Sequence, residues 1–415
     1  MRGPVASVLQ NHYLILTATC TNNFPEPMPQ QLILRNCRLS SAPERQPVSI
    51  LIEGSRIKSL DDTPHAGARS IDAGGRVAAP GFIDLHVQGA GGSDVLDATP
   101  EALQTMSRSL ARLGTTGFLG TTVSQPQKAN FHLALLRDHV HQDLGGAWLL
   151  GIHLEGPFIN VNRKGGIAPD TIYASSPQAL ESLYAIAGDA LRMMTIAPEL
   201  PGNLDIIRRL VAHGTVAAFA HSEATYDDTL RGFDAGISHV THIFNAMPSL
   251  HHRAPGPITA IFEHPTVTAQ VISDGNHLHP AIVHLIYKIL GPHRCACITD
   301  GLQAMGLPDG KYLYNGKEYL SSEGAARYLD GTLIGTTMGL GSIAMKFMEF
   351  TRCTFSEAID TVTRIPAKVL GLERSKGSLA AGMDADIVIL EQDGSVFATI
   401  VAGNVVYQKG TSLQQ

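Results

Sequence analysis

The chain has 415 residues, of which 44% are hydrophobic and 16% are charged, whereas about 25% of the residues in an average globular protein are charged. A net charge of −6 leaves no excess of cations to neutralise a nucleic-acid backbone, so the composition argues against a polyanionic partner. The apolar stretches are too short to cross a bilayer, and the first residues do not resemble a secretory signal. We therefore expect a cytoplasmic protein that binds neither nucleic acid nor membrane.

Strand-rich segments are predicted at both ends of the chain. Residues 1–30 include Pro25, Pro27 and Pro29 and are expected to form an irregular N-terminal extension. Residues 31–79 and 373–415 contain short apolar runs separated by turn residues, and neither segment could bury a core alone. We expect the two segments to pair into one small β-sandwich.

Residues 80–372 repeat one pattern, in which a short apolar run precedes a stretch with helix start and stop signals. Thr99-Pro100 and Gly114, for example, bound one such stretch. Eight runs of strand length occur, at 81–86, 116–122, 148–155, 192–198, 215–221, 237–242, 267–274 and 294–300. Eight strands with eight crossovers predict a (β/α)₈ barrel, and no GxGxxG follows the first run to favour a doubly wound sheet. A polar insertion at 309–331 follows the eighth run.

Acidic and imidazole side chains end several of these runs, where the strands of a barrel face the active site. They are Asp84, His86, Glu155, His221, His242 and Asp300. The five cysteines form no CxxC pair, so a metal would be held by imidazoles and carboxylates. Glu155, His221 and His242 make the His₂Glu set of a catalytic zinc site, and Asp300 beside it could transfer protons. The pattern predicts a metal-dependent hydrolase.

Six motifs resemble those of the amidohydrolase superfamily. They are PGFIDLHVQG at 80–89, HLEGPF at 153–158, AHSEAT at 220–225, THIFNAM at 241–247, ITDG at 298–301 and GxxxxGxDADIVIL at 377–390. The resemblance runs from about residue 32 to the end of the chain. HLEGPF, HxFNAM and a downstream RxPG resemble most specifically the amidohydrolases that deacetylate N-acetylglucosamine 6-phosphate, a linear amide.

This resemblance implies roles for individual residues. It implies one divalent metal ion per subunit, Zn²⁺ by expectation, held by Glu155, His221 and His242, with Asp300 as general acid and base. It also implies a homodimer. Substrate contacts are implied for Gly166, Ile167, Asn245, Ala246, Arg253, Asp274, Gly275, Asn276, His277, Leu333, Ile334 and Gly335. Among them, Arg253 and His277 are expected to bind the sugar phosphate, because a guanidinium and an imidazole both donate hydrogen bonds to it.

Two positions depart from the family pattern. The family has a histidine in a KGAH motif where this chain reads KGGIAP, so Ile167 replaces a hydrogen-bond donor. Either the metal alone polarises the substrate carbonyl, another group donates, or the substrate differs. On the first strand, two-metal relatives have the motif HxH and one-metal relatives have QxN. This chain reads His86-Val87-Gln88, which is intermediate between the two motifs. His86 is therefore our candidate for a ligand of a second metal or for a carbonyl donor.

Three alternatives remain open at this point. The first is the same chemistry on N-acetylgalactosamine 6-phosphate or another N-acyl amino sugar, which Ile167 keeps open. The second is a non-catalytic sugar-phosphate binding protein, although the predicted ligands and Asp300 are all present. The third is a ring-opening amidohydrolase of the dihydroorotase type, in which HxH and a bridging lysine stand where this chain has Gln88 and Glu155.

Overall fold

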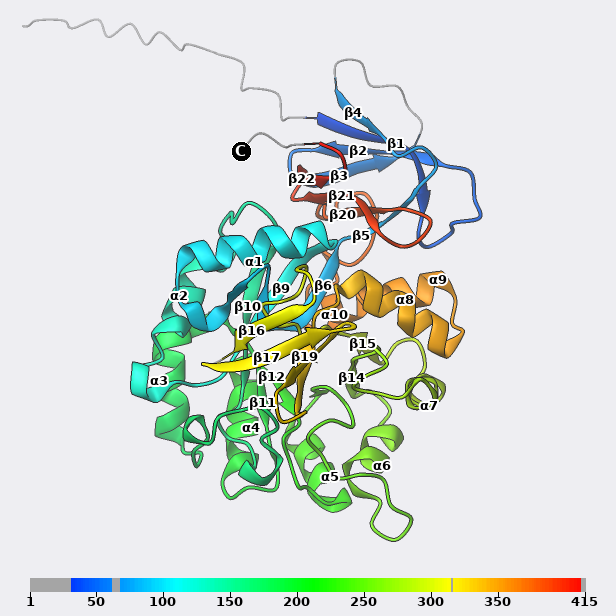
Figure 1. Cartoon of the computed structure of the whole chain (residues 1–415). Helices are drawn as coiled ribbons and strands as arrows, with labels where there is room; N and C mark the ends of the chain where they lie inside the picture. The colour runs from blue at the N-terminus through cyan, green and yellow to red at the C-terminus, as the bar shows by residue number, and fades with distance from the viewer. Residues whose placement is uncertain (1–30, 62–67, 315, 412–415) are drawn as a thin grey trace, which may run out of the picture.

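The structure is a computed structural model that describes residues 31–61, 68–314 and 316–411 (Figure 1). The predicted N-terminal extension, residues 1–30, lies outside the described residues. Among those described, eight parallel strands form one sheet in the order β15-β14-β13-β12-β11-β10-β9-β6. Their bounds are β6 (Phe82–Val87), β9 (Thr115–Thr122), β10 (Trp148–Glu155), β11 (Leu191–Ile196), β12 (Val216–Phe219), β13 (His239–Val240), β14 (Thr268–Val271) and β15 (Cys295–Cys297).

The first and last strands of this sheet meet and complete the barrel. A parallel bridge joins Val87 to Gly301, and the backbone N–H of Asp300 donates to the carbonyl of His86 at 2.9 Å. The predicted (β/α)₈ barrel is therefore confirmed. Each of the eight runs overlaps a strand, although β13 is only two residues long.

Helices follow the strands in alternation and surround the barrel (Figure 1). Thr99 and Ser176 act as N-caps, their side chains accepting backbone N–H groups of Ala102 and Ala179 at 3.2 and 3.1 Å, as is usual for hydroxyl residues before a helix. The helices are α1 (Pro100–Arg112), α2 (Phe131–His139), α3 (Pro177–Ala187), α4 (Asn203–Ala212), α5 (Tyr226–Ala235), α6 (Gly256–Glu263), α7 (Pro280–Leu290) and α8 (Leu340–Thr351).

The segment between β15 and α8 is an antiparallel sheet that extends over the barrel (Figure 1). It consists of β16 (Gly310–Tyr314), β17 (Lys317–Ser322), β18 (Ala325–Tyr328) and β19 (Leu333–Thr336). Alternation along β16 exposes Leu313 and turns Tyr312 and Tyr314 inward, toward the buried Tyr319. The backbone N–H of Thr336 donates to the carbonyl of Asp300 at 3.0 Å, so the sheet is anchored at the mouth of the barrel. The sequence indicated an insertion here but not its strands.

Both ends of the described chain join in a second sheet. Its order is β22-β21-β20-β5-β1-β2-β3, with β4 paired to β1. The bounds are β1 (Gln31–Leu39), β2 (Val48–Glu53), β3 (Arg56–Leu60), β4 (Arg69–Asp72), β5 (Val77–Pro80), β20 (Ile387–Leu390), β21 (Val396–Val401) and β22 (Asn404–Gln408). Side chains from both ends, such as Leu34, Ile52 and Ile389, share one buried core.

The described fold also contains the short elements β7 (Gly89–Ala90), β8 (Ser93–Asp94), α9 (Phe355–Asp360) and α10 (Arg364–Val369), as well as five three-residue 3-10 helices. The expected domain boundaries, at 79/80 and 372/373, stay predictions. Over the described ranges, the structure contains no helix of the length and apolar character needed to cross a membrane.

Candidate active site

A pocket of about 160 Å³ lies where the barrel strands end and the inserted sheet begins. Eleven of the residues expected at the site line it: Glu155, Gly166, Ile167, His221, His242, Asn245, Ala246, His277, Asp300, Leu333 and Ile334. Glu155 ends β10, whereas His221, His242 and Asp300 lie in the segments that follow β12, β13 and β15. Barrel closure brings these strand ends together.

Glu155, His221 and His242 converge on one point in this pocket. The Oε1 atom of Glu155 is 2.9 Å from Nε2 of His221 and 3.0 Å from Nε2 of His242. The two Nε2 atoms are 3.1 Å apart. Each residue offers one ligand atom within 4.8 Å of the others, which makes the trio a possible metal-binding set.

The protonation of His221 favours a cation at this point. Its Nδ1 lies 2.7 Å from the backbone carbonyl oxygen of Arg163, which can only accept a hydrogen bond, so Nδ1 carries a proton and, in the neutral imidazole, Nε2 carries the lone pair. That lone pair faces a carboxylate oxygen and a second imidazole nitrogen, an arrangement that a cation would stabilise. A backbone carbonyl that fixes the tautomer of a histidine ligand is common in metal sites. The donor set therefore fits a divalent metal ion.

Electrostatics keep Glu155 ionised although it is only 6% exposed. Burial alone would raise the pKa of its carboxyl, but the neighbouring imidazoles of His86, His221 and His242 outweigh burial and lower that pKa well below its usual range. Burial also lowers the pKa of His242. A carboxylate beside a neutral imidazole is the state in which both can bind a metal ion.

Three of the central residues adopt left-handed backbone conformations. The φ angles of His221, His242 and Asp300 are 49°, 28° and 48°. Such angles are uncommon for residues other than glycine, and strained positions of this kind cluster at functional sites. The strain supports a functional assignment for these residues, and no pattern in the sequence revealed it.

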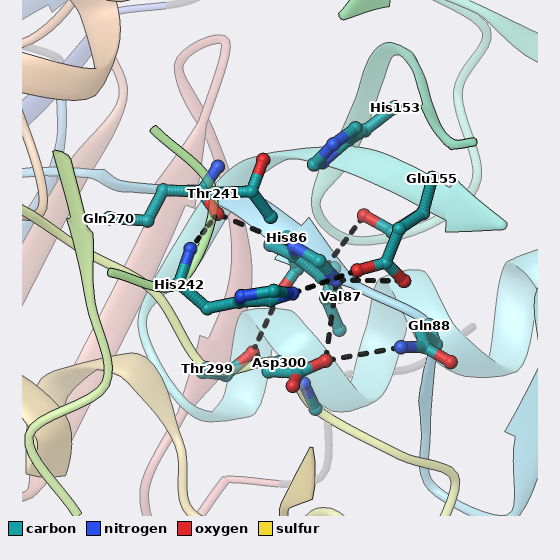
Figure 2. A network of polar contacts seen from close by, with 12 residues as sticks. His86, Val87, Gln88, His153, Glu155, Thr241, His242, Gln270, Thr299 and Asp300 are labelled. Atoms are coloured by element: carbon teal, nitrogen blue, oxygen red, sulfur yellow. Dashed lines mark hydrogen bonds and ion pairs between the residues drawn. The ribbon is translucent and has the colours of Figure 1, made fainter. Parts of the chain in front are cut away.

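Asp300 lines the same pocket as the three candidate ligands, and Figure 2 shows it near Glu155 and His242. Its Oδ1 accepts a hydrogen bond from Nε2 of Gln88 at 3.1 Å and lies 3.3 Å from Nε2 of His86. Burial raises the pKa of Asp300, but the His86 imidazole more than offsets burial and lowers that pKa below its usual value. The carboxyl of Asp300 is therefore ionised and able to accept a proton.

His86 lies behind this cluster, fully buried. Its Nε2 is 3.8 Å from Oε2 of Glu155, and its Nδ1 is 3.4 Å from Oε1 of Gln270. Burial lowers the pKa of His86, but the carboxylates of Glu155 and Asp300 outweigh burial and raise it to about 9. His86 is therefore near the reacting groups, without lining the pocket among the described residues.

Asp84 is not part of the described lining of the pocket. Its Oδ2 accepts the Thr299 hydroxyl at 2.6 Å and its Oδ1 accepts the backbone N–H of His86 at 3.2 Å. Desolvation by burial raises the pKa of Asp84 to about 6. These contacts tie the first strand to the segment before Asp300, so Asp84 supports the site from outside the pocket.

The loop after β14 orients His277. Oδ2 of Asp274 accepts Nδ1–H of His277 at 2.7 Å, and Oδ1 accepts the backbone N–H groups of Asn276 and His277, both at 2.8 Å. The Nε2 atom of His277 consequently faces Oδ2 of Asp300 at 3.9 Å. Asp274 and Asn276 are not among the described residues that line the pocket, and neither are Gly275 and Gly335.

Arg253 lies outside the pocket that most of the other expected residues line. Its side chain is exposed, with Nη1 2.7 Å from Nε2 of the neighbouring His252, and it is absent from the described lining of the pocket. Within this chain the structure does not bring Arg253 and His277 together at one point. Their shared phosphate role stays a prediction.

Ile167 forms part of the wall of the pocket. It is 9% exposed and packs with Val123 and Ile159 in a small apolar cluster. Its side chain therefore presents a hydrocarbon surface where a polar group would have offered a donor.

Two polar residues of the pocket have contacts that the sequence did not indicate. From the sequence, Gln88 was notable only because it stands where two-metal relatives have the second histidine of HxH. In the structure its amide contacts Asp300. Tyr314 lies on the inserted β16, and its hydroxyl donates to Oε1 of Gln88. The alternation of Tyr312 and Tyr314 in the insertion was the only available signal, and it did not specify which tyrosine reaches the pocket.

Comparisons with known proteins agree with this geometry. The chain is 35% identical to the N-acetylglucosamine-6-phosphate deacetylase of Bacillus subtilis (strain 168), over 80% of this chain and 85% of that protein. It is 36% identical to the N-acetylgalactosamine-6-phosphate deacetylase of Escherichia coli O157:H7, over 75% of this chain and 83% of that protein.

A solved structure extends the similarity to the fold. It is that of a mutant N-acetyl-D-glucosamine-6-phosphate deacetylase from Mycobacterium smegmatis in complex with N-acetyl-D-glucosamine-6-phosphate, and it is 31% identical, with a TM-score of 0.83, over 92% of this chain and all of that one. Residues 77–406 match the amidohydrolase family. With its barrel and its Glu155, His221 and His242 cluster, the chain belongs to the amidohydrolase family.

Proposed function

We propose that this protein is a metal-dependent deacetylase that converts N-acetylglucosamine 6-phosphate and water to glucosamine 6-phosphate and acetate. The observation that carries the proposal is the convergence of Glu155, His221 and His242 in one pocket with the ionised Asp300. Similarity to deacetylases of phosphorylated amino sugars over most of the chain supports the substrate class.

Glu155, His221 and His242 would hold one divalent ion, Zn²⁺ by the preference of a His₂Glu set. Such an ion, when bound, supplies Lewis-acid chemistry that polarises a carbonyl and acidifies water. Asp300 takes the proton of the attacking water and returns it to the amine nitrogen as the C–N bond breaks. The Oδ2 atom of Asp300 is suited to this exchange, because Gln88 and His86 lie against Oδ1.

The remaining pocket residues would bind and orient the sugar. Asn245, Ala246, His277, Leu333 and Ile334 surround the space next to Asp300. The imidazole of His277, held by Asp274, presents one ring nitrogen to that space. Arg253 would add a phosphate contact from its exposed loop, and the expected homodimer would be seen by sedimentation of the purified chain.

The test is acetate release from a panel of N-acetylhexosamines, each with and without a 6-phosphate. The proposal predicts the highest kcat/KM for N-acetylglucosamine 6-phosphate and loss of activity after chelation of the metal. A preference for the galactose epimer would mean that Ile167 marks a changed sugar specificity. Failure to release acetate from any member of the panel would contradict the proposed chemistry.

A further inference from the structure

One side-chain amide connects the inserted sheet to the carboxylate of Asp300. The Nε2 atom of Gln88 donates to Oδ1 of Asp300 at 3.1 Å (Figure 2), and the hydroxyl of Tyr314 donates to Oε1 of the same Gln88 side chain. Gln88 directly follows the barrel strand β6, whereas Tyr314 ends β16 of the insertion. The insertion therefore contacts the Asp300 carboxylate through the Gln88 side chain, whereas Thr336 of β19 contacts the backbone carbonyl of Asp300.

The two orientations of the Gln88 amide are not equivalent. An ionised carboxylate only accepts hydrogen bonds, so Asp300 is stabilised by the amide nitrogen and repelled by the amide oxygen. Gln88 is 7% exposed, and a buried amide oxygen without a donor is unfavourable. The Tyr314 hydroxyl supplies that donor and so stabilises the orientation in which the nitrogen faces Asp300.

The Tyr314 hydroxyl keeps its proton for this purpose. Burial raises the pKa of Tyr314 well above its usual range, and the nearby carboxylates of Asp94, Glu155 and Asp300 act in the same direction. A neutral phenol next to an amide oxygen is a hydrogen-bond donor.

The contacts on Asp300 distinguish its two oxygens. Oδ1 accepts from Gln88 and lies 3.3 Å from Nε2 of His86, whereas Oδ2 is 3.9 Å from Nε2 of His277. A proton taken from water would therefore be received at Oδ2. Loss of the Gln88 contact would leave only His86 against Oδ1, so the carboxylate could rotate more freely about its last torsion and its two oxygens would be less clearly distinguished.

We propose that Tyr314 is a positioning residue that acts through Gln88: it orients the amide that holds Oδ1 of Asp300 and so leaves Oδ2 as the oxygen that exchanges the proton. This inference rests on the proposed role of Asp300 as general acid and base. Because Tyr314 acts on the carboxylate, its loss should lower kcat with little change in KM.

A double-mutant cycle tests whether the two residues act as one unit. Tyr314→Phe removes only the hydroxyl, and Gln88→Ala removes the amide. Each should lower kcat by about tenfold, the effect of one hydrogen bond to a charged group, with KM within about twofold of wild type. The double variant should match Gln88→Ala, because Tyr314 has no target without the amide. Losses that multiply in the double variant would overturn the proposal.

Tyr312→Phe is the matched control, since Tyr312 lies on the same strand and its hydroxyl donates to the carbonyl of Pro308 at 2.6 Å. It should retain wild-type kcat. Thermal unfolding and metal content of each variant show whether it is folded and loaded. A comparable loss of kcat in Tyr312→Phe would assign the effect to the stability of the hairpin and overturn the positioning role.

A crystal structure of Tyr314→Phe supplies a readout independent of turnover. The Gln88 amide should leave Asp300 or reverse, with rotation of the carboxylate; an unchanged Gln88–Asp300 contact would contradict the proposal. Failure of the proposed function is seen separately, as a wild-type chain that releases no acetate from any amino sugar. The structural comparison still decides the Tyr314–Gln88 relationship in that case.

Discussion

The Nε2 atoms of His221 and His242 lie 3.1 Å apart, and both lie within 3.0 Å of the same Glu155 oxygen. Two imidazole nitrogens cannot both use a lone pair at this distance without a proton or a cation between them. The Arg163 carbonyl accepts the Nδ1–H of His221 at 2.7 Å, so in the neutral imidazole the facing Nε2 carries the lone pair. This pair of residues is therefore organised around a positive charge, which gives the site its first prediction.

The purified chain should carry about one divalent ion, and Glu155→Ala or His221→Ala should remove most of it. A three-ligand site has no spare donor, and even residues that only support metal ligands are typically worth about 10- to 100-fold in affinity. Elemental analysis after gel filtration measures the metal content. His293→Ala, an exposed histidine just before β15, is the control. Unchanged metal in both ligand variants would contradict the assignment.

Asp300→Asn should keep metal and substrate binding but lose turnover. The amide preserves the shape of the carboxylate yet can neither take nor return a proton, and such transfer contributes about 10²- to 10⁴-fold to the rate. Steady-state kinetics with calorimetric measurement of sugar binding separate the two effects. Activity within a few-fold of wild type would show that another group is the base.

The barrel could be predicted from the sequence because its strands are short apolar runs that end in polar residues. Parallel strands align their carboxyl ends at one end of a barrel. The polar residues at these ends therefore meet there, and they include Glu155, His221, His242 and Asp300. The predicted ends of the strands were less accurate where hydrogen bonding to the adjacent strands decides how long a strand is. The run at 237–242, for example, contains only the two-residue strand β13.

What could not be predicted depends on side-chain geometry across distant segments. Nothing in the spacing of Gln88 and Tyr314 indicated that an insertion more than two hundred residues away would donate to that amide. Similarly, the hydrogen bond from His277 to Asp274 depends on the exact turn of one loop. The inserted strands themselves were missed because leucines lie on their exposed face, at Leu313 and Leu320, and this hides the period of two.

The variant Arg253→Ala tests whether Arg253 binds the 6-phosphate of the sugar. A guanidinium that binds the 6-phosphate should, when removed, raise KM for phosphorylated sugars by about tenfold or more and leave unphosphorylated sugars unaffected. Arg253→Lys should recover only part of the effect, because an ammonium cannot form the two-pronged contact. Equal weakening of both kinds of sugar would remove Arg253 from the phosphate site.

His132 should make the fold sensitive to acid. It is 2% exposed, its Nε2–H donates to the Val123 carbonyl at 3.0 Å, and burial lowers its pKa from 6.5 to about 4. Between these values the unfolded chain binds a proton that the folded chain does not, so stability is present above about pH 6.5 and is lost as the pH falls toward 4.

The expected loss from this one residue is about 2 kcal/mol at pH 5. Urea unfolding of wild type and His132→Gln at pH 7 and pH 5 measures it. The variant should lose less stability between the two pH values. Any loss of metal in acid affects both proteins alike, so equal pH dependence would show that His132 does not titrate in this way.

The last prediction concerns Ile167 and His86. The wall at Ile167 offers no donor to a developing oxyanion, and one preorganised hydrogen bond of that kind can contribute about 3 to 4 kcal/mol to catalysis. His86 is the histidine nearest to Asp300, at 3.3 Å, and could donate in its place. His86→Ala should therefore lower turnover of N-acetylglucosamine 6-phosphate while the metal at Glu155 stays bound, and Ile167→His should partly restore it.

The outcomes of this experiment separate three roles. Unchanged turnover in His86→Ala would reject compensation by His86. Loss of metal together with turnover would instead make His86 a ligand. If the wild type prefers another N-acyl sugar, Ile167 is a specificity residue, because its hydrocarbon surface, packed on Val123 and Ile159, then shapes the pocket for a different substrate. His132→Gln, a buried histidine outside the pocket lining, controls for the general cost of losing an imidazole.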